Sequence, residues 1–429
     1  MYTSTETLYR HFQECGAVST DTRRIPADSI FIALKGPRFN GNQFAAEALQ
    51  QGACYAVVDE RDAVVNERCL LVEDGLKALQ NLARMHRRQL SIPVLAVGGS
   101  NGKTTTKELI AAVLGKKFRT FATRGNLNNH IGVPLTLLSI FADTEMAVIE
   151  MGANAPDEID LLCRIAEPTH GIITNVGLDH LEGFGSHEGV IRANGELYDY
   201  LAQHEGMAFV NTNEPDLVRM AEVLRYLTKY PNPGDFYHCT LLPSDFFVKV
   251  QAEDGTEIQT QLFGRYNFPN IATALCIGKY FEVPPADAHA AIADYVPKNN
   301  RSQLVQKDHN TILLDAYNAN PSSMQAAVEN LAHLKAAHKT VILGDMLEMG
   351  HESESEHRKL GQLLQRLHFD TVLLCGHEMQ YAHREAPGSH WFADRQALKA
   401  WLADHPIRDS YVLLKGSRGI GLEEVVEGL

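Results

Sequence analysis

Short apolar runs recur along the chain, and many of them are followed by a polar turn and then by a helical spacing of apolar positions. This alternation is typical of βα units, in which the strands of a parallel sheet are buried on both faces. The pattern therefore predicts an α/β fold with two such sheets. The predicted strands are residues 94–97, 147–149, 171–174 and 208–210 of one doubly wound sheet, and residues 312–314, 341–343, 372–374 and 412–414 of a second.

The length of the chain predicts several domains. Its 429 residues exceed what one hydrophobic core usually serves, and at about 150 residues per domain they divide into about three. Residues 230–235 predict an exposed turn, followed by a small antiparallel excursion. We expect a small N-terminal α/β domain at residues 1–92, a central domain at 93–298 and a C-terminal domain at 299–429.

Net charge and cysteine usage narrow the class of protein. A formal charge of −14 disfavours a nonspecific nucleic-acid binder, which needs a positive surface. The seven cysteines lack the paired spacing of a zinc site or a disulfide framework, which favours a reducing compartment. The chain starts without a basic and apolar leader, and no run approaches the roughly 20 apolar residues of a membrane span. We expect a soluble cytoplasmic protein with no membrane span and no nucleic-acid partner.

A glycine-rich turn at residues 98–105 carries the clearest chemistry. It lies between an apolar strand and a helical pattern, which is the context that identifies a phosphate loop. Glycines let backbone N–H groups turn toward phosphate oxygens, Lys103 neutralises their charge, and the Thr104 hydroxyl is placed to bind Mg²⁺. The generic pattern has a glycine five residues before Gly102, where Val97 stands, so this loop is a shortened variant. The residues expected to bind ATP and Mg²⁺ are Gly99, Ser100, Asn101, Gly102, Lys103, Thr104 and Thr105.

Other predicted strands end in groups that suit nucleotide chemistry. Glu150 follows residues 147–149, where a carboxylate is well placed to hold Mg²⁺ at the phosphates. His180 follows the next strand, with carboxylates on either side, and is a candidate second metal ligand. The alternative is an ordinary acid at a strand end and a hydrogen-bonded structural histidine. Because ligands of open α/β sheets bind at the carboxyl ends of strands, the position favours the metal site.

Two asparagine-rich segments and a basic loop lie where further contacts are expected. Residues 264–270 precede an Ala-rich helix, residues 315–321 follow a strand of the second sheet, and residues 415–418 follow the last strand. Taken singly, the asparagines fit helix caps or turns, and the basic loop fits an ordinary surface loop. The alternative is that they bind the nucleotide and an anionic group of the acceptor.

The motifs form one ordered set. The set is the Gly-Ser-Asn-Gly-Lys-Thr-Thr loop at 99–105, Glu150, the Thr-Asn-Val-Gly run at 174–177, His180, Asn267, Asn270 and Arg301. In this order the motifs resemble those of the Mur ligase family. Within the family, residues 315–321, 343–350 and 415–418 look like those of the member that adds D-Ala-D-Ala, and residues 20–41 are similar to its UDP-sugar-binding domain. The resemblance spans essentially the whole chain.

The resemblance implies a fold, a reaction and partners. The fold has an N-terminal domain for the UDP end of the substrate, a central phosphate-loop ATPase domain, and a Rossmann-like C-terminal domain that closes over the site. The implied enzyme is an ATP-dependent amide-forming ligase of peptidoglycan biosynthesis. ATP phosphorylates the terminal carboxylate of UDP-MurNAc-tripeptide, and the amine of D-Ala-D-Ala attacks the resulting acyl phosphate. We expect a monomer whose partners are these two small-molecule substrates.

The same resemblance implies a role for each site residue. Lys103 and Thr104 hold the phosphates, and the expected metal ligands are Thr104, Glu150 and His180. The expected nucleotide contacts outside the loop are Asn267, Asn270, Arg301 and Asp315. The expected contacts of the UDP-muramoyl group are Thr20, Asp21 and Arg23, and those of the incoming dipeptide are Asn318, Asn320, Lys415 and Arg418.

One position departs from the family's usual plan. Mur ligases usually carry a lysine, modified to a carbamate that binds a second Mg²⁺, where this chain has Asn194. An asparagine forms no carbamate and carries no charge, although its carbonyl oxygen is able to bind a metal or orient a water. Glu196 is an alternative substitute. We keep Asn194 among the catalytic residues and expect a weaker second metal site.

Two other functions fit part of the chain. Folylpolyglutamate synthase shares the ATPase architecture and the mechanism, but it usually lacks a separate N-terminal UDP-sugar domain, and the first 92 residues argue against it. The other alternative is a regulatory phosphate-loop ATPase without ligase activity, which Asn194 favours. Phosphate release that depends on both UDP-MurNAc-tripeptide and D-Ala-D-Ala distinguishes the ligase from both.

Overall fold

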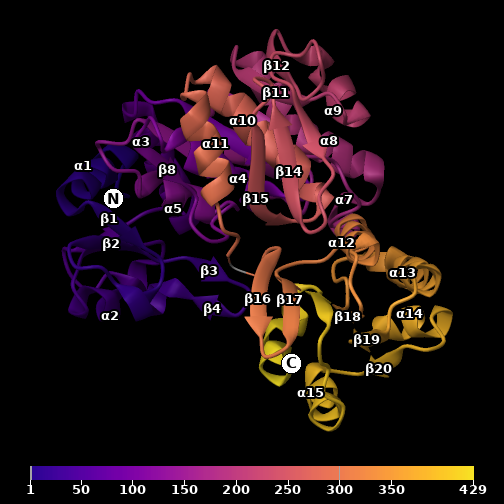
Figure 1. Cartoon of the computed structure of the whole chain (residues 1–429). Coiled ribbons are helices and arrows are strands. Elements are labelled where there is room, and N and C mark those ends of the chain that lie inside the picture. The colour runs from indigo at the N-terminus through magenta and orange to yellow at the C-terminus, as the bar shows by residue number, and fades with distance from the viewer. Residues whose placement is uncertain (1, 299) are drawn as a thin grey trace.

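The computed structural model describes residues 2–298 and 300–429 and contains three α/β units, each built around its own parallel or mostly parallel sheet (Figure 1). The three-domain α/β prediction is therefore confirmed. The predicted start of the C-terminal domain falls on Asn299, which lies outside the described residues, as does Met1. Within the described ranges no helix is long and apolar enough to cross a membrane.

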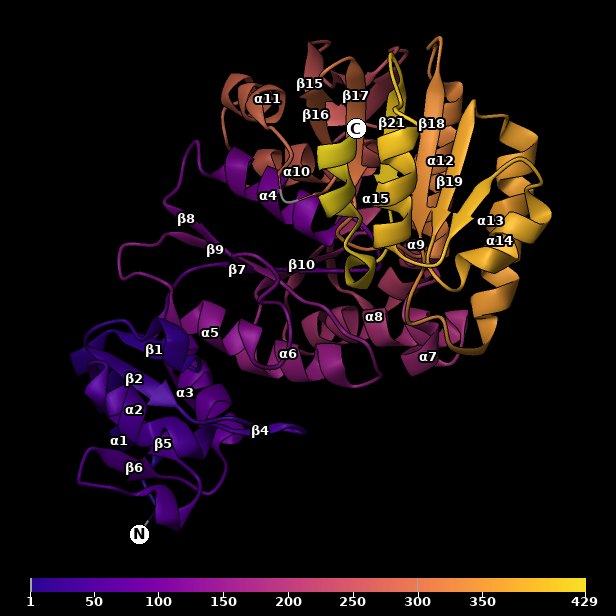
Figure 2. The same ribbon diagram turned by 90° about the horizontal axis from the view of Figure 1, so that it is seen from below.

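The N-terminal unit is a four-stranded parallel sheet in the order β1-β2-β5-β6. One face packs against α1 and α3 and the other against α2, while the hairpin β3–β4 projects from the unit (Figure 2). The strands are β1 (Ala17–Ser19), β2 (Ser29–Ile32), β3 (Lys35–Gly36), β4 (Phe39–Asn40), β5 (Ala53–Val58) and β6 (Cys69–Leu71), and the helices are α1 (Thr5–Cys15), α2 (Ala45–Gln50) and α3 (Gly75–Gln89).

The central unit holds a six-stranded parallel sheet in the order β12-β11-β10-β7-β9-β8. All four strands predicted for it are present, and two edge strands complete it. The chain leaves β7 toward β8 and β9 on one side and returns to β10 on the other, so β7 lies at the topological switch point. The strands are β7 (Val94–Gly98), β8 (Thr120–Ala122), β9 (Met146–Glu150), β10 (His170–Ile173), β11 (Met207–Asn211) and β12 (Tyr226–Tyr230).

Successive residues of β7 face opposite sides of this sheet, because side chains alternate along a strand. Val94 and Ala96 pack with α5, α6 and α8, whereas Leu95 and Val97 pack with α4 and α10. The predicted antiparallel excursion is present as the sheet β13-β14-β15. The remaining elements are α4 (Lys103–Leu114), α5 (Gly132–Leu138), α6 (Glu158–Ala166), α7 (Leu181–Phe184), α8 (His187–Gln203), α9 (Pro215–Met220), α10 (Phe268–Tyr280), α11 (Pro285–Asp294), β13 (Cys239–Leu242), β14 (Phe247–Ala252) and β15 (Glu257–Phe263).

The C-terminal unit has a six-stranded sheet in the order β16-β17-β21-β18-β19-β20, parallel except for β16. One face packs against α12, α13 and α14 and the other against α15. The four strands predicted for the second sheet are all present. The elements are β16 (Gln303–Lys307), β17 (Asn310–Asp315), α12 (Pro321–His333), β18 (Lys339–Gly344), α13 (Ser353–Leu367), β19 (Thr371–Cys375), α14 (Met379–Glu385), β20 (His390–Phe392), α15 (Arg395–Asp404) and β21 (Tyr411–Lys415).

A buried arginine fastens the N-terminal unit to the central one. Arg87, near the end of α3, is 7% exposed and donates from its guanidinium to the carbonyls of Leu90 at 2.8 Å, Ala166 at 2.9 Å and Glu167 at 3.0 Å. Ala166 and Glu167 end α6 of the central unit. Because all three acceptors are backbone carbonyls, a substitution leaves them without this donor in a dry interface.

We expect Arg87→Met to lower the free energy of unfolding by about 2–4 kcal/mol, because it removes three charge-assisted hydrogen bonds and leaves buried carbonyls unpaired. Arg88→Met is the matched control. Arg88 is more than half exposed, and its 2.6 Å ion pair with Glu167 lies at the surface, so its loss should cost less than about 1 kcal/mol. Urea unfolding followed by circular dichroism measures both, and equal losses in the two variants would contradict the assignment.

Candidate active site

The candidate site lies where three neighbouring parallel strands end. The phosphate loop follows β7, Glu150 is the last residue of β9, and residues 174–180 follow β10. The loop needs glycine at Gly102, whose φ is +78° and where an added Cβ would lie 2.7 Å from the Asn270 Oδ1. Lys103 then begins α4, so the positive end of the helix dipole faces the loop.

Lys103 folds back over its own loop. Its ammonium donates to the carbonyl of Ser100 at 3.0 Å and to that of Gly99. Burial lowers the pKa of Lys103, and the negative charges of Asp179 and Glu150 act in the opposite direction. The loop thus holds the ammonium at its centre, where phosphate oxygens are expected.

The residues at the expected magnesium site fit that ion. Glu150 is buried, and its two carboxylate oxygens accept hydrogen bonds from the Thr104 hydroxyl at 3.0 and 3.1 Å, while the Asn128 amide donates to it at 2.9 Å. Carboxylate and hydroxyl oxygens are the hard ligands that Mg²⁺ prefers. No group of three or more His, Cys, Asp or Glu side chains suited to a metal occurs in the described part of the chain. Nucleotide phosphates and water would therefore complete the coordination.

Three polar residues that support this site were not predicted from the sequence. Asn128 comes from the segment before α5, and Lys107 is a buried ammonium on α4, 3.7 Å from a Glu150 oxygen. Asp179 is also buried, and its carboxylate accepts the Ser100 hydroxyl at 2.5 Å. Asp179 follows a strand end directly before His180, which is the one sequence signal that points to it.

The loop is also fastened to the segment after β10. The Asn175 side chain accepts the Asn101 N–H at 3.1 Å and donates to the Asn101 carbonyl at 3.0 Å. The Gly177 N–H donates to the Ser100 hydroxyl at 2.9 Å. Two neighbouring strand ends thereby fix one conformation of the phosphate loop.

The structure places His180 at the seam between the central and C-terminal units. The Nδ1 atom of its ring lies 2.5 Å from a carboxylate oxygen of Glu348, which follows β18. His180 is thus close in sequence to Asp179, which touches the loop, but the carboxylate that it contacts comes from the other unit.

Asn267 and Asn270 are buried against the phosphate loop. The Asn270 Oδ1 accepts the Thr106 hydroxyl at 3.0 Å, and its amide donates to Asn267 at 2.9 Å. The Asn267 amide in turn donates to the Phe263 carbonyl at 2.8 Å. Both residues therefore support the loop and the start of α4, and a contact with adenine stays a prediction.

A charged cluster from the C-terminal unit includes four of the predicted residues. The Lys415 ammonium lies 2.6 Å from the Asp315 carboxylate, since β17 and β21 are neighbours. Arg301 stacks over the Tyr317 ring at 3.7 Å, and Arg418 lies over the same ring at 5.4 Å. Tyr317 lies three residues before Asn320, whose amide donates to the Asn101 side chain of the phosphate loop at 2.8 Å.

Asn320 has a structural contact that the sequence did not predict. Its side chain caps α12 by accepting the Ser323 N–H at 2.9 Å, and its amide donates to the Asn101 side chain at 2.8 Å. The phosphate loop is therefore bonded directly to the C-terminal unit. Asn318, by contrast, is exposed, and its side chain accepts the Ala319 N–H at 2.9 Å.

The residues predicted for the UDP end lie apart from the phosphate loop. Thr20, Asp21 and Arg23 follow β1 in the N-terminal unit, which Figure 2 shows to one side of β7 and β9. Asp21 caps the turn by accepting the Arg23 N–H at 3.0 Å. Hydrogen bonds from the Arg23 guanidinium lower the pKa of Asp21 to about 2. The two side chains hold each other as an ion pair on an exposed surface.

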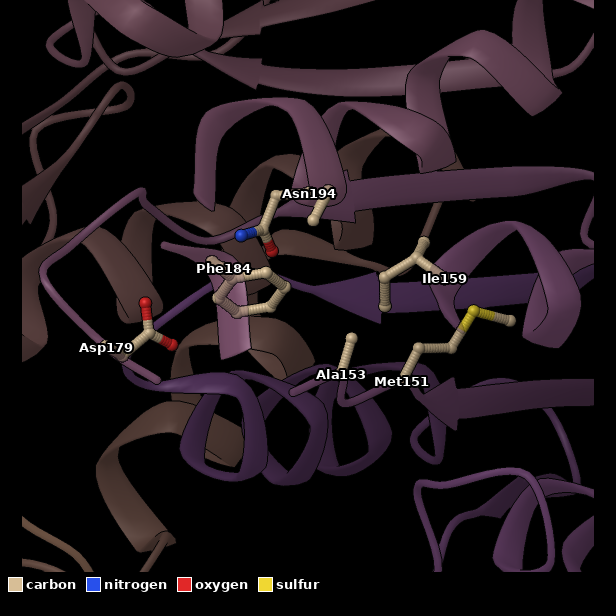
Figure 3. Close-up of a pocket in the computed structure, with 8 residues that line it drawn as sticks. Met151, Ala153, Ile159, Asp179, Phe184 and Asn194 are labelled. Atoms are coloured by element: carbon tan, nitrogen blue, oxygen red, sulfur yellow. The ribbon is translucent and has the colours of Figure 1, made fainter. Parts of the chain in front are cut away.

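Asn194 lies on α8 beside a narrow crevice. Asn194 is buried, and its amide donates to the Val190 carbonyl at 2.9 Å within α8. It lines a narrow crevice without room for a water molecule, and the Phe184 ring lies between Asn194 and Asp179 in this view (Figure 3). The Glu196 carboxylate instead accepts two backbone N–H groups at the start of α6. The crevice is lined by Gly99, Met151, Ala153, Ile159, Asp179, Phe184, Ala193 and Asn194.

Comparison with protein-family models matches three consecutive parts of the chain. The Mur ligase family catalytic domain matches residues 15–87, the Mur ligase middle domain matches residues 97–278, and the Mur ligase glutamate ligase domain matches residues 300–418. The matched regions follow one another in the order of the three units and together cover most of the chain.

Individual relatives match over nearly the whole length. UDP-N-acetylmuramoyl-tripeptide–D-alanyl-D-alanine ligase of Bacillus subtilis is 35% identical, over 96% of this chain and 92% of the relative. A crystal structure of MurF from Acinetobacter baumannii has a TM-score of 0.88 at 28% identity, covering 99% of this chain and 98% of that one. MurF ligase from Thermotoga maritima in complex with ADP has a TM-score of 0.85 at 28% identity, covering 96% of each chain. On these matches, and with its phosphate loop and strand-end carboxylates in place, the chain belongs to the Mur ligase family.

Proposed function

We propose that the chain joins D-Ala-D-Ala to UDP-MurNAc-tripeptide with ATP, a step of peptidoglycan biosynthesis. The observation that carries the proposal is the hydrogen bond between Asn101 of the phosphate loop and Asn320 of the C-terminal unit. It brings a second domain, with its cationic cluster, against the place where ATP is expected. The identity of the two substrates rests on relatives that bear this ligase's name over 96% of the chain, and this favours the ligase over both alternative functions.

In the first step the tripeptide carboxylate attacks the γ-phosphorus of ATP, which gives an acyl phosphate and ADP. Lys103 and the N–H groups at the start of α4 face the phosphates and stabilise the charge that moves onto ADP. Thr104 and Glu150 would hold Mg²⁺, which neutralises charge on the β- and γ-phosphates. Asn128 and Lys107 keep the Glu150 carboxylate in one orientation.

In the second step the amine of D-Ala-D-Ala attacks the acyl carbon. The tetrahedral intermediate loses phosphate, the C–O bond to the phosphate breaks, and the amine releases a proton to give the amide. Arg301 and Arg418 both lie close to the Tyr317 ring, and two neighbouring guanidinium groups suit the carboxylate of the dipeptide and the leaving phosphate. Lys415 is held by Asp315, which keeps the third cation in place.

We also propose domain boundaries at 92/93 and 298/299, Mg²⁺ as the metal, and a monomeric, cytoplasmic enzyme. Thr20, Asp21 and Arg23 are proposed to contact the UDP end of the substrate. The hydrogen bonds and ion pairs described above support the proposed residue roles at the nucleotide and dipeptide sites.

The function predicts that phosphate release needs both acceptor substrates. With ATP and Mg²⁺ present, phosphate should appear at a steady rate only when UDP-MurNAc-tripeptide and D-Ala-D-Ala are both added, because the acyl phosphate turns over through the dipeptide amine. A coupled phosphate assay measures this rate, with each substrate omitted in turn. Steady release that is independent of D-Ala-D-Ala would support a regulatory ATPase, and release stimulated by a folate would support the folylpolyglutamate activity.

We expect Asp179→Asn to lower kcat/KM for ATP at least about tenfold, because it removes a negative charge that supports the Lys103 ammonium and weakens the contact with Ser100. Asp199→Asn is the matched control, since Asp199 is exposed on α8 in the same unit. Initial rates at varied ATP measure the effect. Equal kcat/KM values in the two variants would show that Asp179 does not support the reaction of ATP at this site.

We expect Asn194→Lys to lower the Mg²⁺ concentration that half-saturates activity, because a lysine at this place is able to form the carbamate in bicarbonate buffer. Asn194→Met is the control, with an unbranched side chain and no amine. Rates across a Mg²⁺ titration compare the three proteins. Identical curves for Asn194→Lys and the parent would contradict a weaker metal site caused by Asn194.

A further inference from the structure

A tyrosine at the end of the central unit is bonded to the helix that begins at the phosphate loop. Tyr295 is the first residue after α11, and its extended backbone leads the chain away from that helix toward the C-terminal unit. Its hydroxyl donates to the Glu108 carboxylate at 2.5 Å. Glu108 lies on α4, which Lys103 begins, and α11 packs beside α4 (Figure 1). The connection between the two units therefore starts from a point that is fixed on the phosphate-loop helix.

The hydrogen bond between Tyr295 and Glu108 is of a strong kind. Burial and the negative charge of Glu108 raise the pKa of Tyr295, so the hydroxyl keeps its proton and donates it. A hydroxyl that donates to an ionised carboxylate forms a shorter and stronger bond than one between neutral groups. The ring of Tyr295 also packs against the apolar cluster of α4 and α10. Phenylalanine would keep this packing and remove only the donor.

Glu108 is linked to the expected magnesium site through a buried lysine. The Lys107 ammonium lies 3.8 Å from one Glu108 oxygen, and the Tyr295 hydroxyl donates to the other. The same ammonium lies 3.7 Å from a Glu150 oxygen and donates to the Thr123 carbonyl at 2.8 Å. Lys107 therefore stands between the carboxylate expected to hold Mg²⁺ and the carboxylate that holds Tyr295.

The far end of the connection is bonded to both units. The Ser302 hydroxyl forms a hydrogen bond of 3.0 Å with the hydroxyl of Tyr266 in the central unit, and the Ser302 N–H donates to the Asp315 carboxylate at 3.1 Å. Arg301 directly precedes Ser302 and stacks over the Tyr317 ring. Because the connection is bonded at both ends, the place of Arg301 and Asp315 depends on where it starts.

We propose that Tyr295 and Glu108 are positioning residues, whose hydrogen bond holds the C-terminal unit docked over the nucleotide site. The proposal rests on the proposed function in one respect, the cations that the C-terminal unit brings to the nucleotide. Without the bond the connection starts from a less fixed point, and the unit is docked in fewer molecules. A ligand that needs the docked state then binds more weakly in proportion to that fraction.

Backbone amides at the seam between the two units report docking without any substrate. The Leu178 N–H donates to the Ser322 hydroxyl at 3.2 Å, and the Arg265 N–H donates to the Asn330 side chain at 3.1 Å. Hydrogen–deuterium exchange of the full-length protein, followed by mass spectrometry, measures the protection of both amides. We expect Tyr295→Phe to speed their exchange about fivefold or more, because loss of a charge-assisted hydrogen bond favours undocking.

The affinity for ADP in the presence of Mg²⁺ tests the link to the nucleotide. Titration calorimetry should find a dissociation constant that is about fivefold higher in Tyr295→Phe than in the parent, because the docked fraction is smaller. Glu108→Gln keeps an oxygen that accepts the Tyr295 hydroxyl, but without the charge. We expect this variant to lie between the parent and Tyr295→Phe in both measurements.

Tyr230→Phe is the matched control. Tyr230 is buried in the same unit, and its hydroxyl forms a hydrogen bond of 2.7 Å with that of Thr273, so this variant also loses one tyrosine hydrogen bond. It should leave both the exchange at the seam and the ADP dissociation constant unchanged. The proposal would be overturned by unchanged exchange or an unchanged ADP constant in Tyr295→Phe, or by equal changes in Tyr230→Phe.

Neither measurement uses the acyl substrates. If Tyr295→Phe changes both values while phosphate release does not depend on D-Ala-D-Ala, the ligase function fails and the role of Tyr295 stands. If phosphate release depends on both substrates and exchange at the seam is the same in Tyr295→Phe as in the parent, the function stands and the role of Tyr295 fails.

Discussion

The site depends on the register of three parallel strands. Val97 of β7 pairs with Glu150 of β9 on one side and with Ile172 of β10 on the other. The three strands therefore end at one level, and the loop after β7 emerges between a carboxylate and a polar segment. A slip of one residue would turn Glu150 to the other face of the sheet. Thr104 and Asn128 would then lose the carboxylate with which they form hydrogen bonds.

The N-terminal and C-terminal units are both joined to the central unit that holds this site, but at different places. The C-terminal unit reaches the loop through Asn320 and reaches His180 through Glu348, so its contacts fall on residues that we propose to serve the nucleotide. The N-terminal unit is joined to the centre by buried hydrogen bonds from Arg87 and touches none of these groups through Asp21 or Arg23. This division suits an enzyme in which one end of a long substrate is held far from the reacting carboxylate.

Sequence patterns predicted the parts of the fold that are buried on both faces. The strands at 94–97 and 412–414 are continuous apolar runs between polar turns, and only a central parallel strand has that environment. The phosphate loop was also predictable, because its glycines and Lys103 meet a local requirement of backbone geometry. Edge strands such as β8 and β20 were not predicted, since they are short and only partly buried.

The parts of the site that escaped prediction depend on contacts between distant segments. An aspartate after a strand reads as solvated, and only the fold shows that Asp179 is buried against Ser100. Asn194 was identified by its position in the family pattern, but its place in a crevice without room for water follows from the packing of α8 against the loop. His180 and Glu348 belong to different units of the chain. No local sequence pattern therefore predicts that they lie in contact.

We infer that this strand-end site forms an acyl phosphate on the substrate's carboxylate. UDP-MurNAc-tripeptide labelled with ¹⁸O in its terminal carboxylate tests it directly, with ATP, Mg²⁺ and D-Ala-D-Ala present. Mass spectrometry of the released phosphate should find one ¹⁸O atom per molecule, because the bond between the acyl carbon and that oxygen breaks when the amine attacks. Phosphate without ¹⁸O, released at the same rate as the amide product, would contradict the account.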